Sequence, residues 1–279
     1  MSLPGSSFPS GPPTAPPAGW YPDPTNQRWM WWDGARWFVP EPAPESSTWF
    51  PAIPTLALPA AVLGISFVVA FTVVSRLATV LTGTVGMVVA LALLAVDSIG
   101  MPLVAWLSSM RYGTRKFAHD LGFRVRWIDV PLGIAGAIVL TITIIIVSLT
   151  FRALGVPHGS NLTDVADRGR DGFLFLMLFV LAGIVAPVTE ELMFRGVIFR
   201  GLSSRWSSWA AVGLQALVFG AAHFTPDQGW GNVDLIVSLA LMGAGLGALA
   251  KATGRLGAGM IAHSTFNCMQ LGLLWLTLK

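Results

Sequence analysis

From Pro54 onwards the chain is a succession of long apolar stretches separated by short polar turns. A helix needs about 20 mostly apolar residues to cross a hydrocarbon layer of about 30 Å. Seven stretches approach or reach this length, so the sequence predicts an all-α, polytopic transmembrane bundle over residues 54–279. The predicted spans are residues 54–75, 82–107, 130–151, 173–193, 207–223, 233–250 and 256–277.

The composition agrees with a protein that is solvated by lipid. Only 11% of the residues are charged, against about 25% in soluble domains. The net charge of +3 gives no reason to expect a nucleic-acid partner. A single cysteine, Cys268, excludes an intramolecular disulfide. The bilayer is therefore the first partner that the sequence predicts.

The N-terminal part differs from the bundle. Residues 1–18 are rich in Pro, Gly and Ser and are expected to be disordered. Residues 19–40 carry five tryptophans and an Asp33-Gly34 turn signal, which predicts a small Trp-rich β module. Residues 41–53 form the linker. The module resembles a short Trp-rich domain of unknown function on bacterial membrane proteins. It fits a module at the membrane interface or a reader of proline-rich peptides.

Loop charges predict the orientation, because cytoplasmic loops of membrane proteins are rich in Lys and Arg. The basic segments follow the second, fourth and sixth stretches, so the N-terminus is expected in the cytoplasm and the C-terminus outside. No signal-peptide pattern is visible, and the first span would target the chain to the cell membrane. The residues concerned are Arg111, Arg115, Lys116, Arg124 and Arg126, then Arg195, Arg200 and Arg205, then Lys251 and Arg255.

A few polar residues fall in or at the edge of the apolar stretches, where each charge costs about 2.5–3.5 kcal/mol on insertion scales. Such residues need a structural or a functional reason. For one of them, Asp97, the sequence leaves open whether it lies inside the membrane or at a helix end. The full set is Asp97, Glu190, Glu191, Arg195, His223, His263 and Asn267.

Three spacings organise this set. Glu191 and Arg195 are i,i+4 on one helix, which predicts an ion pair and leaves Glu190 on another face. His223 follows a run of small residues that lets another helix approach closely. His263 and Asn267 are also i,i+4 and project to one place. Each spacing alone fits ordinary helix packing, whereas together they supply a base, a water-binding group and polarising groups.

In these motifs the chain strongly resembles the intramembrane protease family of CAAX prenyl proteases and bacteriocin-processing or abortive-infection proteins. The family signatures EExxxR, FxxxH and HxxxN stand here in order over residues 190–195, 219–223 and 263–267. The likeness covers about residues 60–277. It implies an endopeptidase that hydrolyses a peptide or a membrane-associated protein.

The resemblance also implies roles for single residues. Glu190 would activate a water held with His223, and His263 and Asn267 would stabilise the oxyanion. Glu191 and Arg195 would support the geometry of the site. Alternatively, Glu190, His223 and His263 would bind one zinc ion, and the sequence does not decide between zinc and a metal-free site.

Two further functional classes are compatible with the sequence. The chain could be a non-catalytic scaffold or immunity-type binder on the same fold, or a transporter in which buried Glu and His relay protons. An enzyme requires Glu190 and His223 to meet, although ideal antiparallel spans would place them at opposite depths. We therefore expect the fourth span to continue through Phe194–Arg205 as one long helix, with Glu190 near mid-depth.

Overall fold

The computed structural model describes residues 56–78, 83–160 and 172–277, together with residues 17, 19–22, 29–32, 35 and 37–38 near the N-terminus. The chain divides into two compact units, Met1–Trp49 and Phe50–Lys279, and each is described by itself. The predicted disordered tail, the linker and the Asp33-Gly34 turn lie outside the described residues, apart from residue 17 of the tail.

Three short antiparallel strands form the described part of the N-terminal unit, in the order β1-β2-β3. Trp20 lies opposite Trp31, and Trp32 lies opposite Trp37. That the strands make an independently folded module stays a prediction. Their bounds are Gly19–Pro22, Trp29–Trp32 and Trp37–Phe38.

The second unit is helical. One helix runs without a break from α6 to α8 and passes twice into π-helical geometry, in η1 and η2. The elements are α1 Leu58–Ala78, α2 Gly83–Tyr112, α3 Phe117–Asp120, α4 Asp129–Ala153, α6 Gly172–Val180, η1 Leu181–Val185, α7 Ala186–Glu191, η2 Leu192–Ile198, α8 Phe199–Leu202, α9 Ser208–Ala221, η3 Pro226–Gln228, α10 Gly231–Thr253 and α11 Gly257–Thr277.

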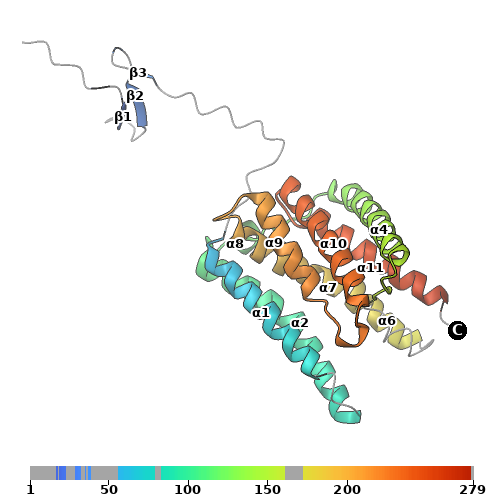
Figure 1. Ribbon diagram of the computed structural model, residues 1–279. Helices are drawn as coiled ribbons and strands as arrows, with labels where there is room; N and C mark the ends of the chain where they lie inside the picture. The colour runs from blue at the N-terminus through green and yellow to red at the C-terminus, as the bar shows by residue number, and fades with distance from the viewer. Residues whose placement is uncertain are drawn as a thin grey trace, which may run out of the picture. The chain divides into compact units, whose positions relative to one another are not determined.

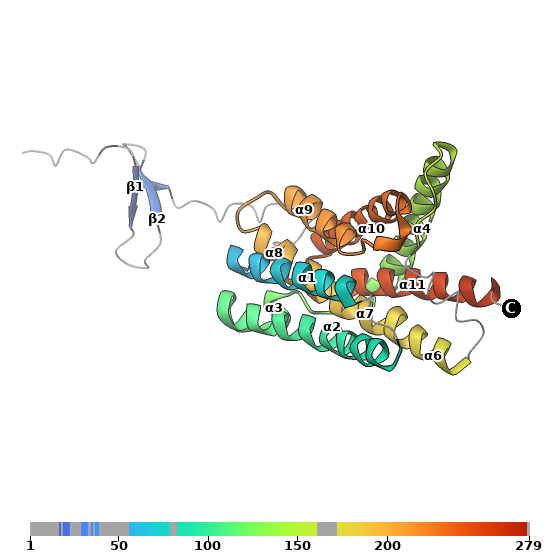
Figure 2. The ribbon, with the colours of Figure 1, turned by 60° about the horizontal axis from the view of Figure 1, so that its bottom comes forward.

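The α6–α8 helix lies at the centre of the bundle (Figure 1). The α1–α2 hairpin packs along one side of it, and α9, α10, α11 and α4 lie on the other (Figure 2). Its residues from Leu192 to Leu202 are all buried. The expectation of one long fourth helix is confirmed, because Phe175–Leu202 is a continuous apolar helix of 28 residues. Glu190 lies near its middle.

Every predicted span falls on a helix, yet the count of seven spans is not confirmed. Within the part of the chain that the structure describes, four helices are long and apolar enough to cross a membrane: Leu58–Ala78, Asp129–Ala153, Phe175–Leu202 and Gly231–Thr253. They make the chain a membrane protein. Helix α9 has 14 residues and is about 21 Å long, shorter than the hydrocarbon layer.

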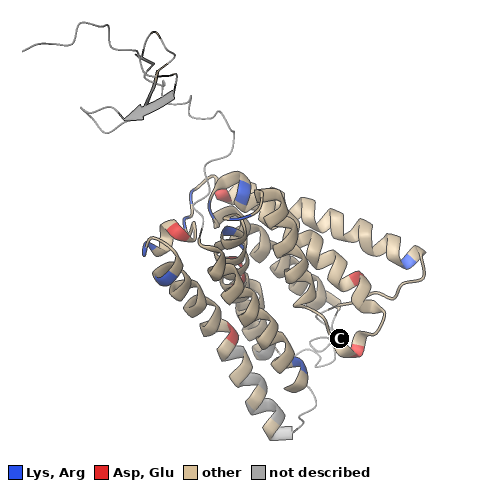
Figure 3. Ribbon diagram, turned by 60° about the vertical axis from the view of Figure 1, so that its left-hand side comes forward, with Lys and Arg blue, Asp and Glu red and all other residues tan. Residues whose placement is uncertain are grey.

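The loops that carry most of the Lys and Arg meet at one end of the bundle (Figure 3). The N–H of Leu256 donates to the carbonyl oxygen of Gly122, at 2.9 Å, and the N–H of Gly257 donates to that of Arg124. The guanidinium of Arg255 binds Asp129, with Nη2 2.6 Å from Oδ1. Hydrogen bonds thus tie the loop before α4 to the turn before α11.

Two arginines that the sequence analysis assigned to a basic loop lie elsewhere. Arg195 and Arg200 are fully buried in the central helix, where Arg200 Nη2 donates to the carbonyl oxygen of Gly254 at 2.9 Å. The assignment was wrong because the fourth helix continues beyond the hydrophobic run from which its end was predicted. Of that segment only Arg205 remains in a turn.

The Asp129–Arg255 pair generates the first prediction. Asp129 is fully buried, so Arg255→Met should leave an uncompensated carboxylate and lower the free energy of unfolding by about 3 kcal/mol. Chemical unfolding in detergent measures this. Arg124→Met, at an exposed position of the loop before α4, should change the value by less than about 0.5 kcal/mol. Equal effects of the two substitutions would contradict the prediction.

Candidate active site

A buried ion pair in the central helix organises the site. Arg195 Nη1 donates to Glu191 Oε1 at 2.7 Å, and both side chains are fully buried. Arg195 Nη2 donates to the carbonyl oxygen of Gly243 at 3.0 Å, and Gln215 Nε2 donates to the same oxygen at 2.8 Å. The predicted i,i+4 pair is therefore present, and it also links the central helix to α9 and α10.

His263 lies between the two glutamates. Its Nδ1 is 3.3 Å from Glu191 Oε1, and its Nε2 is 3.8 Å from Glu190 Oε2. A carboxylate only accepts hydrogen bonds, so Nδ1 carries the proton in that contact. This orientation turns Nε2 towards Glu190. The two adjacent carboxylates consequently have different surroundings: Glu191 is fully buried, whereas Glu190 lines the cavity next to His263 Nε2.

The imidazole ring of His223 is oriented by the backbone carbonyl of Phe219. Its Nδ1 donates to the carbonyl oxygen of Phe219 at 2.8 Å, which leaves Nε2 for other partners. The ring of Phe219 lies 4.9 Å from that of His223 and 5.9 Å from that of His263, centroid to centroid. The guanidinium of Arg195 lies 4.8 Å from the centroid of the same ring. Phe219 thus packs between the two histidines and the ion pair.

Asn267 is anchored by the π-helical part of the central helix. Its Nδ2 donates to the carbonyl oxygen of Ala182 at 2.8 Å, within η1. An amide nitrogen has two N–H groups, so one of them remains for a ligand. A π-helix displaces the backbone hydrogen bonds from their α-helical partners and is frequent at functional sites. Here it supports the position of Asn267.

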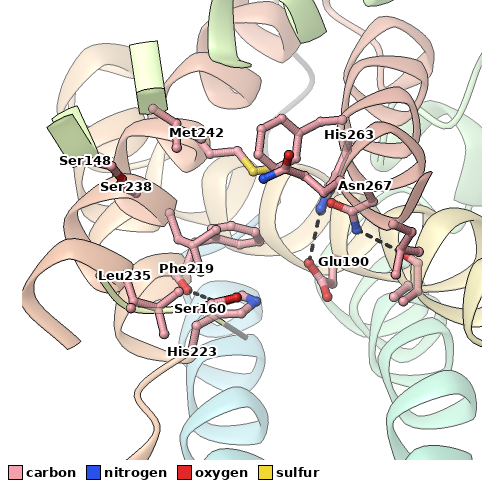
Figure 4. A pocket seen from close by; sticks show the side chains of 18 of the residues that line it. Ser148, Ser160, Glu190, Phe219, His223, Leu235, Ser238, Met242, His263 and Asn267 are labelled. Atoms are coloured by element: carbon pink, nitrogen blue, oxygen red, sulfur yellow. Dashed lines mark hydrogen bonds and ion pairs between the residues drawn. The ribbon is translucent and has the colours of Figure 1, made fainter. Parts of the chain in front are cut away.

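The four residues that the sequence singled out as catalytic line one cavity of about 200 Å³, as do Ser148, Ser160, Leu235 and Met242 (Figure 4). Glu190, His263 and Asn267 lie together at one side of it, and His223 lies apart from them, next to Phe219. Glu191 and Arg195 do not line the cavity and lie behind it. The four are Glu190, His223, His263 and Asn267.

The donor set is suited to a metal ion in one respect only. Each histidine holds its Nδ1–H on a protein acceptor and leaves Nε2 free, as metal-binding histidines do. However, in the part of the chain that the structure describes, no three His, Cys, Asp or Glu side chains are gathered closely enough to hold a metal ion. Glu190, His223 and His263 line one cavity without forming a ligand set.

With this geometry established, comparison with known families identifies the segment. Residues 172–269 match the family described as type II CAAX prenyl endopeptidase Rce1-like. Residues 172–269 are an Rce1-like domain. Searches of curated proteins and of solved structures gave no match. The Rce1-like domain contains all three motifs, and its family together with the apolar helices supports a protease that works in the membrane.

The sequence analysis missed two polar residues of this region: His158 lines the cavity, and Asp234 is hydrogen-bonded to it. Asp234 is buried in α10 and accepts hydrogen bonds from His158 Nδ1, at 2.7 Å, and from Ser148 Oγ. A carboxylate inside the sixth apolar stretch should have been noticed by the reasoning applied to Glu190. His158 gives no such signal, because it lies in a loop that precedes the Rce1-like domain.

Asp97, whose depth the sequence left open, lies inside α2 rather than at its end. Its Oδ1 is buried without a hydrogen-bond partner among the described residues. The carboxylate is close enough to interact electrostatically with Glu190 of the Rce1-like domain. It therefore belongs to the surroundings of the site, on the side of the α1–α2 hairpin.

The close approach of α11 to Glu191 generates the second prediction. A Cβ at Gly259 would lie 2.7 Å from Glu191 Oε2, and Glu191 cannot move freely because Arg195 and His263 hold it. Gly259→Ala should therefore lower the free energy of unfolding of the full-length protein by about 1–3 kcal/mol.

Gly272 supplies the matched control on the same helix. A Cβ there would meet nothing within 4 Å, so Gly272→Ala should be neutral or stabilise by up to about 1 kcal/mol. Denaturant titration of both variants in detergent measures the difference. A Gly259→Ala protein as stable as the wild type would show that the contact between α11 and Glu191 is loose.

Proposed function

We propose that this chain is an intramembrane endopeptidase in which Glu190 activates the water that hydrolyses the substrate. The observation that carries the proposal is the position of Glu190: it faces a cavity with His223, His263 and Asn267, while the neighbouring Glu191 is neutralised by Arg195. The family of residues 172–269 supports a protease and therefore a peptide or protein substrate.

Water activation falls to Glu190 and His223. His223 has Nδ1–H on the Phe219 carbonyl, so in the neutral ring Nε2 accepts a hydrogen bond from a water molecule in the cavity. Glu190 takes a proton from this water as the water oxygen bonds to the carbonyl carbon of the substrate. A positioned carboxylate contributes to such a step as a general base.

The negative charge that forms on the carbonyl oxygen needs a hydrogen-bond donor. The second N–H of Asn267 is a neutral donor next to Glu190 and His263, because the first N–H is held by the carbonyl oxygen of Ala182. His263 becomes a donor at Nε2 only when its ring is protonated, and Glu191 at 3.3 Å from Nδ1 stabilises that cation. One such donor is worth about 2.7–4 kcal/mol of transition-state stabilisation.

The reaction is completed when the C–N bond breaks and the leaving nitrogen receives the proton that Glu190 took from water. His263 Nε2, 3.8 Å from Glu190 Oε2, is placed to hold that proton between the two events. The proton count then balances: water supplies one hydroxyl to the acyl product and one proton to the amine. No step passes through a metal ion.

We also propose an orientation of the chain in the cell membrane. The basic end of the bundle is assigned to the cytoplasm of the cell because of the Lys and Arg in its loops. The Trp-rich module is assigned to the same side, since it precedes the first span. Labelling of single cysteines placed at Lys116 and at Ser160, from outside sealed vesicles, tests this assignment.

The third prediction concerns Glu190. Glu190→Gln keeps the shape of the side chain and removes its basicity, so cleavage of a peptide library in liposomes should fall by at least about 100-fold. Asp227→Asn removes an exposed carboxylate of η3 outside the cavity and should leave the rate unchanged. Full activity of a folded Glu190→Gln protein would instead favour a non-catalytic scaffold or binder.

The fourth prediction concerns metal dependence. Because Glu190, His223 and His263 are not gathered as ligands, cleavage should stay within about twofold after dialysis against a zinc chelator. Metal analysis of the dialysed protein accompanies the rate measurement. Loss of activity that added zinc restores would show that the three side chains close around an ion during the reaction.

A further inference from the structure

The cavity has a second polar end, built around Asp234. Oδ1 of this buried carboxylate accepts hydrogen bonds from Ser148 Oγ, at 2.7 Å, and from Ser238 Oγ, at 3.3 Å. Oδ2 accepts from His158 Nδ1, at 2.7 Å, and from the N–H of Gly159, at 3.3 Å. Four donors satisfy both oxygens, so Asp234 serves to orient its neighbours.

His158 differs from the other three donors because half of it is accessible. Its side chain is 47% exposed and lines the cavity. Nδ1 must carry a proton to bind the carboxylate, which leaves Nε2 as the nitrogen for a ligand. Nε2 has no partner among the described residues. Asp234 thus fixes the tautomer and direction of a ring whose other nitrogen is free.

The segment that carries His158 is held in place by contacts of its neighbours Gly159 and Ser160. The N–H of Ser160 donates to Gln228 Oε1 at 2.8 Å, and Gln228 Nε2 donates back to the carbonyl oxygen of Ser160. Gly159 packs so closely on α10 that a Cβ would collide with the carbonyl oxygen of Gly231. These contacts hold the segment independently, so the imidazole is available for another task.

Between the two polar ends, large apolar side chains line the cavity beside His223 and Ser160. Ser148 and Ser238 lie at one side of Figure 4 and Glu190, His263 and Asn267 at the other, with Met242 and Phe219 between them. Leu235, Leu239 and Phe266 also line this space. An apolar side chain fits there, while the backbone of the same peptide reaches the polar groups at both ends.

We propose that His158 is a substrate-binding residue whose Nε2 accepts a hydrogen bond from a backbone N–H of the peptide, remote from the bond that is cleaved. This inference rests on the proposed function and names what the cavity selects: an uncharged internal peptide segment with an apolar side chain. The described residues that line the cavity include no Lys or Arg, so these residues offer no fixed cation to a free carboxylate.

Two substitutions separate binding from a structural role. His158→Asn keeps an N–H where Nδ1 lies, and with it the bond to Asp234, but lacks the distal acceptor. His158→Gln places an amide oxygen near the position of Nε2. Both are made in the Glu190→Gln background, so that peptide affinity is measured without cleavage, and in the wild-type background for KM and kcat.

The probes are library peptides that the wild-type protein cleaves, or that Glu190→Gln binds, each carrying one N-methyl group at successive positions. At one position of this series the methyl group should remove the hydrogen bond to His158 and weaken binding to Glu190→Gln by about 3–10-fold. It should have no such effect once His158→Asn is added. In the wild-type background His158→Asn should raise KM by a similar factor, with kcat changed less than about twofold, and His158→Gln should restore part of the affinity.

Equal N-methyl effects with and without His158→Asn would overturn the assignment of Nε2. A peptide with a free terminal carboxylate that binds more than about tenfold better than its amide would overturn the choice of an internal segment. Failure of the proposed function looks different, because it would appear as the absence of Glu190-dependent cleavage while peptide binding still responds to His158→Asn.

Discussion

The arrangement of the site depends on one buried ion pair. Arg195 and Glu191 are both fully buried, and a charge in such a place persists only if it is paired and hydrogen-bonded. Their remaining bonds reach Gly243 on α10 and His263 on α11, so the pair connects three helices. Removal of either partner would leave a bare charge in the core. Stability and the position of the candidate catalytic groups therefore have the same origin.

This connection explains how adjacent glutamates differ. Successive residues of a helix point about 100° apart, so Glu190 and Glu191 do not present their carboxylates in the same direction. Glu191 faces the interior and orients His263 through Nδ1. Glu190 faces the cavity and lies 3.8 Å from Nε2 of the same ring. Glu190 lines the cavity, whereas Glu191 and Arg195 do not, so a small polar cavity is enough to solvate the groups that need it. The charges of Glu191 and Arg195 compensate each other.

Local spacing predicted what local spacing controls. The i,i+4 relation of Glu191 and Arg195, the helices under each apolar stretch, and the continuous central helix all follow from helix geometry and hydropathy. That Glu190, His223, His263 and Asn267 line one cavity was expected from their motifs, and their chemical roles stay predictions. Arg195 and Arg200 were assigned to a basic loop because they are charged, and their buried partners Gly243 and Gly254 are distant in sequence. His158 and Asp234 meet across 76 positions, which no periodicity reveals.

The two π-helical segments have a consequence for how the central helix tolerates change. Helix α7, which carries both glutamates, lies between η1 and η2. Each π segment bonds i to i+5, so it holds an additional residue relative to an α-helix of the same bonding. Loss of one residue from η2 would therefore let the helix continue as an ordinary α-helix, with Glu190 and Arg200 kept at nearly the same relative rotation. Each π segment thus lets the central helix hold one more residue while the glutamates keep their rotational setting.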